Sequence, residues 1–448
     1  MVDFMKEILN ELKKRTDEYE LYLQNTITNE IHIQKNRINF TDKTVNSGYG
    51  VRVHENGMGF SSSNIFSKSM IEQTIKNAFK SSEMTEKIKF NFPSSQKFGN
   101  VKNVDKIIKE DGERTVKSYV DNLLKSVEDK TTISFGKVRT YDSYIYIVNS
   151  EGIDLSREET TMMIELSIML EKNGKKVEFW SHEYRRRMED MPLSLVNEWI
   201  RFANDQLIAT EPKTEKTTVI FSPTSVLDGL GSVISSHVTG ESKLNKTSIL
   251  KPNEKVAVKD LTVISDGLYP YGLMTSEFDD EGIPQRKNIL IDKGIFQDYV
   301  YDQFYGIKDG GKSTGNGLRQ GETFFVFNGK YGGMPGNQVS NFFVEPGKQS
   351  IEQLIKEVQH GILVNTFSWL YPDIITGNFS SEIRSGYYIK NGELSQPIKG
   401  GLVTGNFFDL IKNISGVSNK SVITSGGTIL AGICPYIRFE NVQIAGKN

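Results

Sequence analysis

The chain has 448 residues, a length at which more than one domain is expected. Its 54 Lys and Arg residues against 56 Asp and Glu residues leave a net charge of −2, which argues against a partner bound through nucleic-acid phosphates. The single cysteine, Cys434, excludes a disulfide or a thiolate metal cluster within the chain, so a reducing, cytoplasmic location is expected.

The N-terminal segment predicts one α+β unit at residues 1–90. Residues 1–14 place apolar side chains at helical spacing and have no secretion-signal pattern; no apolar run is long enough for a transmembrane helix, so no membrane partner is expected. Apolar and polar residues then alternate over 18–62, which predicts an antiparallel meander. A helix is expected at 68–79, and the polar segment 84–103 is predicted to be a linker.

A second unit of the same order is predicted at residues 104–210. It begins with a helix at 104–129 and continues with alternating strands from 131 to about 183. Within them, Asn173-Gly174 is typical of a tight hairpin turn. A helix at 192–207 closes the unit.

The remaining segment, 216–448, predicts a β-rich C-terminal domain. The strand "TVIFS" leads into Ser222-Pro223, a helix cap followed by the residue favoured at the first helical position. Val226, Leu230 and His237 then share one face of the expected helix. Short strands and glycine turns follow, with helices near 350–357 and 406–413. The whole chain is therefore expected to be α+β: helix and antiparallel-meander units followed by a β-rich domain.

The phrase "SHVTGE", Ser236 to Glu241, is the first candidate site. His237 and Glu241 stand four residues apart, so on one helix both could face a metal ion. A catalytic zinc needs three protein ligands, and the spacing marks no third one. The alternative, which we favour, is that His237 continues the apolar stripe and Glu241 is solvated. Ser236 and His237 are adjacent, so on a helix they point about 100° apart and do not form a nucleophile–base pair.

Three other segments carry weaker signals. His182-Glu183 begins like a zinc-peptidase motif, but its setting predicts a strand. The acidic loop at 279–281 lacks the spacing of a calcium loop, and we expect a turn braced by the following Arg286 and Lys287. The glycine-rich segment 310–317 lacks a complete phosphate loop; its glycines leave a substrate-facing turn open.

Several longer stretches resemble the TldD/PmbA family over nearly the whole chain. They are "GYGVRVHENGMGFSSSN", "FDDEGIPQRKNILIDKGIFQDYVYDQFYGIKDGGKSTGNG", "TGNFSSEIRSGYYIKNGELSQPIKGGLVTGNFFDLIKNI" and "PYIRFENVQIAG". In that family the TldD type carries HExxxH and a downstream cysteine that bind zinc, whereas the PmbA or TldE type lacks them. Aligned on Gly240, Ser236 and Glu241 replace the two histidines and His237 replaces the glutamate. Ser421 falls near the cysteine position, and Cys434 does not match it.

The resemblance therefore implies a PmbA/TldE-type subunit with no catalytic residue and no metal ligand of its own. Its expected role is in a cytoplasmic peptidase that trims unfolded peptides, with zinc bound by a TldD-type sister subunit; a homodimer is the other expected assembly. We expect the extended substrate to be bound by strand addition. The positions expected to contact it are Gly315, Asn316, Thr376 and Asn378.

Two alternatives stay open at this point. One is a self-sufficient homodimeric hydrolase in which His237 and Glu241 gain a third ligand from elsewhere. The other is a non-enzymatic regulatory or adaptor protein acting on DNA gyrase, which the balanced charge of the chain does not favour.

Overall fold

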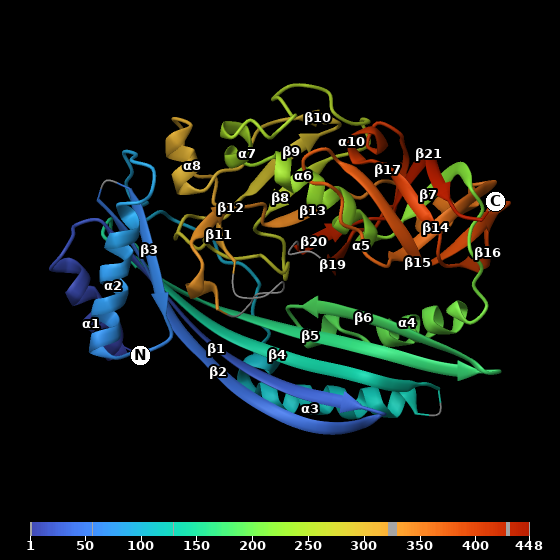
Figure 1. The fold of residues 1–448 in the computed structure, drawn as a ribbon, viewed down its shortest axis with the longest axis horizontal. Helices are drawn as coiled ribbons and strands as arrows, with labels where there is room; N and C mark the ends of the chain where they lie inside the picture. The colour runs from blue at the N-terminus through green and yellow to red at the C-terminus, as the bar shows by residue number, and fades with distance from the viewer. Residues whose placement is uncertain (1, 56, 129, 321–328, 427–430, 448) are drawn as a thin grey trace.

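The computed structural model describes residues 2–55, 57–128, 130–320, 329–426 and 431–447. Long antiparallel strands and helices make up the first half of the chain, and many shorter strands make up the second (Figure 1). This confirms the α+β class. Among the described residues, every helix is too short or too polar to cross a membrane.

The first half builds a single antiparallel sheet in the order β3-β2-β1-β4-β5-β6. The strands are β1 Tyr19–Gln34, β2 Arg37–His54, β3 Met58–Ser63, β4 Thr132–Asn149, β5 Asp154–Lys172 and β6 Lys175–Arg185. Because β1 pairs with β4, this sheet is shared by the segments 1–90 and 104–210. The division of the chain into 1–90, 104–210 and 216–448 remains a prediction about separately folding units.

The two faces of this sheet have different partners. The helices of the first half are α1 Val2–Lys13, α2 Lys68–Ser82, α3 Lys106–Val127 and α4 Leu193–Gln206, with a short 3₁₀ turn, η1 Met188–Asp190. Leu21 and Leu23 of β1 contact the core formed with α1 and α2, and Ile33 contacts the core formed with α3 and α4. Tyr22, on the opposite face, packs against Phe278 of the C-terminal half. Because successive side chains of a strand point to opposite faces of the sheet, one face packs against the helices and the other packs against the C-terminal half.

Two local expectations have different outcomes. Asn173 and Gly174, both with positive φ (53° and 73°), connect β5 and β6 and confirm the predicted hairpin. The segment 84–103, by contrast, is not a free linker. Its Phe90 and Phe92 are buried in a cluster of their own, and the Asn149 side-chain amide donates to the carbonyl of Pro93 at 2.8 Å. Its low aliphatic content is offset by these aromatic side chains.

The C-terminal half contains two larger sheets and a small two-stranded one. One sheet has the order β10-β9-β8-β13-β20-β19, from β8 Val263–Asp266, β9 Lys287–Asp292, β10 Ile295–Phe296, β13 Asn341–Val344, β19 Val422–Ser425 and β20 Ala431–Cys434. The other has the order β14-β7-β21-β17-β15-β16, from β7 Glu215–Phe221, β14 His360–Phe367, β15 Asn378–Lys390, β16 Glu393–Ile398, β17 Leu402–Asn406 and β21 Ile437–Ala445, with β18 Ile414–Val417 beside β21. The small sheet pairs β11 Gly317–Arg319 with β12 Pro335–Asn337.

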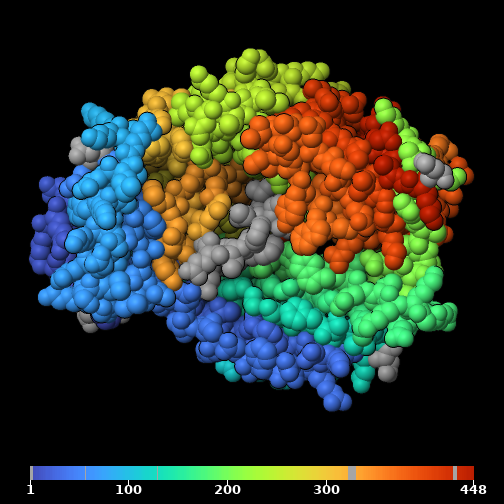
Figure 2. Space-filling view, in the orientation of Figure 1, coloured from blue at the N-terminus to red at the C-terminus, as the bar shows by residue number. Residues whose placement is uncertain are grey.

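The β14–β15 pairing closes β14, β7, β21, β17 and β15 into a ring. A single apolar core joins this ring to the other large sheet, and the helical stretch from Pro223 to His237 contributes to that core. The remaining helices are α7 Gly240–Leu244, α8 Gln303–Lys308, α9 Ile351–Lys356 and α10 Phe407–Leu410, with the 3₁₀ turn η3 Lys330–Gly332. On the face shown in Figure 2, the molecule is hollowed near its centre, among yellow, orange and red segments of the C-terminal half.

Candidate functional site

The helix that opens the C-terminal half begins as its sequence predicts. Ser222 caps it by accepting a hydrogen bond from Ser225 N–H at 3.3 Å, and Pro223 occupies the first turn. The chain continues without a break through α5 Pro223–Val226, a π-helical turn η2 Leu227–Gly231 and α6 Ser232–His237. The predicted stripe of Val226, Leu230 and His237 is buried, which confirms that this face packs into the core.

The helix ends immediately after His237. Val238 leaves helical geometry (ψ 13°) and Thr239 is extended, where its side chain caps the separate helix α7. The backbone of Val300 fixes this break, because it donates to the carbonyl of Val238 and accepts from Gly240 N–H, both at 2.8 Å. The expectation that His237 and Glu241 share one helical face is therefore wrong. Pairing with a distant segment of the chain outweighs the local helical pattern.

The imidazole of His237 is buried and fully engaged. Its Nδ1 accepts from Ile249 N–H at 3.1 Å, so Nε2 carries the proton and donates to the carbonyl of Ile375 at 3.1 Å. The ring also packs edge-on against Phe408. Burial lowers the pKa of His237, which favours the neutral ring. No lone pair of this histidine is left for a metal ion in this conformation.

Ser236 and Glu241 do not converge with that ring. The Ser236 hydroxyl lies 2.8 Å from the carbonyls of both Val233 and Ile374. The side chain of Glu241 is exposed and interacts with Tyr305 of α8 instead. Among the described residues, no group of three or more His, Cys, Asp or Glu side chains is arranged to hold a metal ion. In this conformation, Ser236, His237 and Glu241 do not offer a common set of ligands.

Two of the four predicted substrate positions lie in the interior. The Asn316 side chain is fully buried and donates to the carbonyl of Gln338 at 2.8 Å and to Ser265 Oγ at 3.1 Å. Gly315 has φ +78°, and a Cβ there would lie 2.3 Å from the carbonyl oxygen of Pro284. In this conformation both residues hold one loop against another, and the Asn316 side chain does not reach the surface.

The other two positions are exposed. Thr376 and Asn378 lie at the start of β15, where Asn378 Nδ2 donates to Thr376 Oγ1 at 3.2 Å. Asn406 Nδ2 donates to the carbonyl of Thr376 at 2.7 Å. Thr376 directly follows Ile375, whose carbonyl contacts His237, so this exposed pair lies beside the end of α6.

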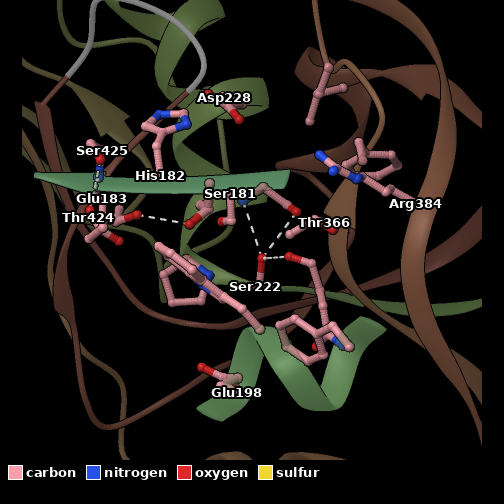
Figure 3. A pocket seen from close by; sticks show the side chains of 18 of the residues that line it. Ser181, His182, Glu183, Glu198, Ser222, Asp228, Thr366, Arg384, Thr424 and Ser425 are labelled. Atoms are coloured by element: carbon pink, nitrogen blue, oxygen red, sulfur yellow. Dashed lines mark hydrogen bonds between the residues drawn. The ribbon is translucent and has the colours of Figure 1, made fainter. Parts of the chain in front are cut away.

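A cavity of about 240 Å³ lies at the other end of the same helix, between the N-terminal sheet and the C-terminal half (Figure 3). One side comes from β6 and α4, and the other from α5, η2, β14, β15 and β19. His182 and Glu183 line it from β6, which confirms the strand predicted for them. Sequence patterns did not indicate this cavity, because its lining comes from segments that are far apart along the chain.

Buried contacts fix the acidic side of the cavity. Glu183 accepts from the Ser425 hydroxyl at 2.7 Å and forms an ion pair with Arg185. Burial lowers the pKa of His182, and its Nε2 lies 3.4 Å from the carbonyl of Gly426.

The thiol of Cys434 is fully buried and its pKa is raised by burial, so it is unsuited to nucleophilic attack.

The acidic loop at 279–281 joins the two halves of the molecule. Its carboxylates are completely buried and do not pair with Arg286 or Lys287, so the predicted bracing is wrong. Arg52 donates to Glu281 at 2.9 Å, and Arg157 pairs with Asp280. The cations come from β2 and β5, which the local sequence could not indicate.

Further ion pairs extend this network. Glu20 of β1 accepts from Arg52 Nε at 2.9 Å and from Arg319 of β11 at 2.6 Å. The network also includes two carboxyl groups with raised pKa values. Burial, reinforced by Glu281, raises the pKa of Asp302 to about 8 and that of Asp279 well above its usual range. The N-terminal sheet and the C-terminal half are thus held together by a desolvated set of charges.

Two segments of the chain match models of one protein family. Residues 214–446 match the model of the PmbA/TldA metallopeptidase C-terminal domain, and residues 19–82 match that of the PmbA/TldA metallopeptidase domain 1. A metalloprotease from Methanocaldococcus jannaschii is 25% identical over 419 residues, covering 89% of each chain.

Two solved structures share the fold over almost the whole chain. TldE from Thermococcus kodakarensis superposes with a TM-score of 0.87 at 24% identity, covering 99% of this chain and all of that one. A candidate modulator of DNA gyrase from Thermotoga maritima superposes with a TM-score of 0.81 at 18% identity, covering 99% of each chain.

Proposed function

This chain belongs to the PmbA/TldD metallopeptidase family, and from this premise we propose that it is a zinc-free, TldE-type subunit of a two-subunit metallopeptidase. Its TldD-type partner would bind the zinc ion and carry out hydrolysis. The substrates would be unfolded peptides in the cytoplasm. The observation that carries the proposal is the hydrogen bonding of His237, both of whose ring nitrogens have protein partners.

The extent of α6 supports the same proposal. A HExxxH motif spans six residues, and the frame aligned on Gly240, residues 236–241, crosses the break after His237. The six-residue window that lies on a helix and ends at His237 is 232–237, "SVISSH". In that window Ser232 takes the place of the first histidine and Val233 that of the glutamate. Valine cannot accept the proton of an attacking water, so the general base would come from the partner.

Strand addition remains the proposed way of binding the extended substrate. Thr376 and Asn378 support it, because they are exposed and lie beside the end of α6. Gly315 and Asn316 would contribute indirectly, by holding the loops behind the substrate.

Metal content and activity test this proposal. The purified chain alone is expected to bind less than stoichiometric zinc by mass spectrometry and to leave an unfolded peptide such as reduced, carboxymethylated casein uncleaved. Addition of a TldD-type protein with intact HExxxH is expected to give cleavage together with a heterodimer in size-exclusion chromatography. One zinc ion per chain and cleavage by the chain alone would contradict the proposal and favour the homodimeric hydrolase.

His237→Ala further distinguishes the zinc-free subunit from the homodimeric hydrolase. The substitution removes a buried side chain together with the hydrogen-bond partner of Ile249 N–H and of Ile375 C=O, so we expect a loss of roughly 2–4 kcal/mol in the free energy of unfolding. Activity of the assembled enzyme, measured well below the unfolding midpoint, is expected to stay within about threefold of wild type. Glu241→Gln, at an exposed position, should change neither quantity under this proposal, whereas the homodimeric hydrolase predicts that it abolishes activity. Abolished activity with unchanged stability would show that His237 is a ligand.

A regulatory role towards DNA gyrase is the remaining alternative, because two structural relatives carry that description. Affinity purification of the tagged chain from its own cells separates the possibilities. We expect a TldD-type protein to be recovered; recovery of gyrase in its place would support the adaptor role.

A further inference from the structure

We propose that the cavity at the start of α5 binds the free C-terminal carboxylate of a peptide whose last residue is aromatic or large and apolar. The proposal rests on the proposed function, since it supplies the end-group specificity of a peptide-binding subunit. It depends on Arg384 and Thr366, two polar side chains that line the cavity and have no hydrogen-bond or ion-pair partner among the described residues.

Arg384 is a cation that forms no ion pair with any described residue. It extends from β15 into the cavity, where its guanidinium lies over the rings of Phe179 at 4.7 Å and Trp180 at 5.9 Å. Within the described part of the chain, no carboxylate or carbonyl accepts a hydrogen bond from it. Burial lowers the pKa of Arg384. A half-buried guanidinium of this kind favours an anionic ligand, because a carboxylate would take two of its N–H groups at once.

Thr366 provides the second polar contact. Its Oγ1 is buried and has no hydrogen-bond partner among the described residues. The register between β14 and β15 shifts on both sides of Thr366, which is paired with Ser385, the neighbour of Arg384. A bulge of this kind redirects a side chain and is common beside functional sites. Thr366 and Arg384 lie on the same side of the cavity, away from His182 and Glu183 (Figure 3).

The rest of the lining selects the ligand's side chain. Trp180, Trp199 and Phe202 form an aromatic wall. At the rim, the exposed rings of Trp369 and Tyr371 stack 5.8 Å apart at 13°. Such walls bind a planar or bulky apolar group through burial and ring contacts. A volume of about 240 Å³ suits one terminal residue, with the preceding peptide leaving past the rim.

The acids of the cavity do not neutralise Arg384. Glu183 is paired with Arg185, and Glu198 is paired with Arg201. Asp228 lines the cavity from η2 and adds negative charge on the helix side. A second carboxylate on the ligand would be repelled there, so the favoured ligand has one carboxylate and an apolar side chain.

The chain carries its own probe of this cavity. All three of its tryptophans, Trp180, Trp199 and Trp369, line it. Intrinsic tryptophan fluorescence therefore reports on this site without a label. The titration uses the full chain alone and requires neither zinc nor a partner, so its outcome is independent of the activity test of the proposed function.

The probes are the tripeptides acetyl-Ala-Ala-Phe with a free carboxylate and with an amidated C-terminus, together with inorganic phosphate. We expect a saturable fluorescence change with the free acid and at least about tenfold weaker binding of the amide, the size expected for loss of a charge-assisted pair. Equal binding of acid and amide, or saturable binding of phosphate without binding of the free acid, would overturn the proposal.

Variants test the two residues. Arg384→Met keeps an apolar stem against Phe179. It is expected to weaken binding of the free acid by about tenfold or more and to leave binding of the amide unchanged. Thr366→Val is expected to weaken binding of the free acid about threefold to tenfold, and Thr366→Ser is expected to restore that binding. Arg187→Met is the matched control, since this arginine also lies over an aromatic ring, Tyr271, but is outside the cavity. Equal loss for acid and amide in Arg384→Met would indicate a structural role and reject the assignment.

Discussion

Arg52→Met is expected to lower the free energy of unfolding by roughly 3–5 kcal/mol, because it leaves buried carboxylates without their cation. Glu281 would lose its 2.9 Å hydrogen bond from Arg52 and Glu20 one of its two arginines. Both carboxylates are at most 1% exposed, so water cannot replace the lost partner. Urea unfolding followed by circular dichroism measures the change.

A surface ion pair provides the matched control. Lys117 Nζ lies 2.5 Å from Asp121 Oδ1 on α3, and both side chains are about half exposed. Lys117→Met should therefore lower the free energy of unfolding by less than about 1 kcal/mol. The double variant Arg52→Met with Glu281→Gln should recover part of the loss, because one uncompensated charge is removed. A single Arg52→Met that unfolds at the wild-type midpoint would show that the network does not hold the two halves together.

Asp302→Asn is expected to stabilise the protein at alkaline pH. The pKa of Asp302 is raised to about 8 by burial and by Glu281, against an opposing effect of Arg52. The folded state therefore keeps a proton that the unfolded chain releases from about pH 4 upward. The free energy of unfolding should fall as pH rises through the window up to about 8, and the neutral asparagine should remove this contribution. Asparagine can still cap α8, where Asp302 accepts from Tyr305 N–H.

The measurement is the unfolding midpoint of both proteins between pH 5 and 9. We expect the variant to match wild type most closely at pH 5, to exceed it increasingly up to about pH 8, and to exceed it by a nearly constant amount above that pH. Asp309→Asn is the contrasting control: the pKa of Asp309 is lowered through Lys243 and Tyr301, which outweigh burial. Its substitution should destabilise at neutral pH and leave the slope from pH 5 to 9 unchanged. Parallel curves for wild type and Asp302→Asn would contradict a retained proton.

Local chemistry made several features predictable. Ser222 and Pro223 start a helix wherever the following residues can bury an apolar face, and this helix does so through Val226 and Leu230. Asn173 and Gly174 adopt positive φ at low cost, which fixed the hairpin between β5 and β6. These outcomes depend on neighbouring residues alone.

The candidate site depended on contacts that local patterns do not contain. His237 and Glu241 looked like partners at a spacing of four residues, yet Val300 ends the helix between them. The acidic loop found its cations on β2 and β5, far from Arg286. Arg384 and Thr366 gave no sequence signal, because each is ordinary within its own strand.

The sequence by itself determined the α+β class and the resemblance that indicated the family. It also determined the start and the buried face of the helix that opens the C-terminal half. Its period-two and period-3.6 patterns are local properties, set by side-chain direction along a strand or helix. Only the tertiary structure decided where that helix ends, which charges neutralise the acidic loop, and that Arg384 lines a cavity without forming an ion pair with any described residue. Those features arise from pairing and burial between distant segments, whose energies no short window of sequence contains.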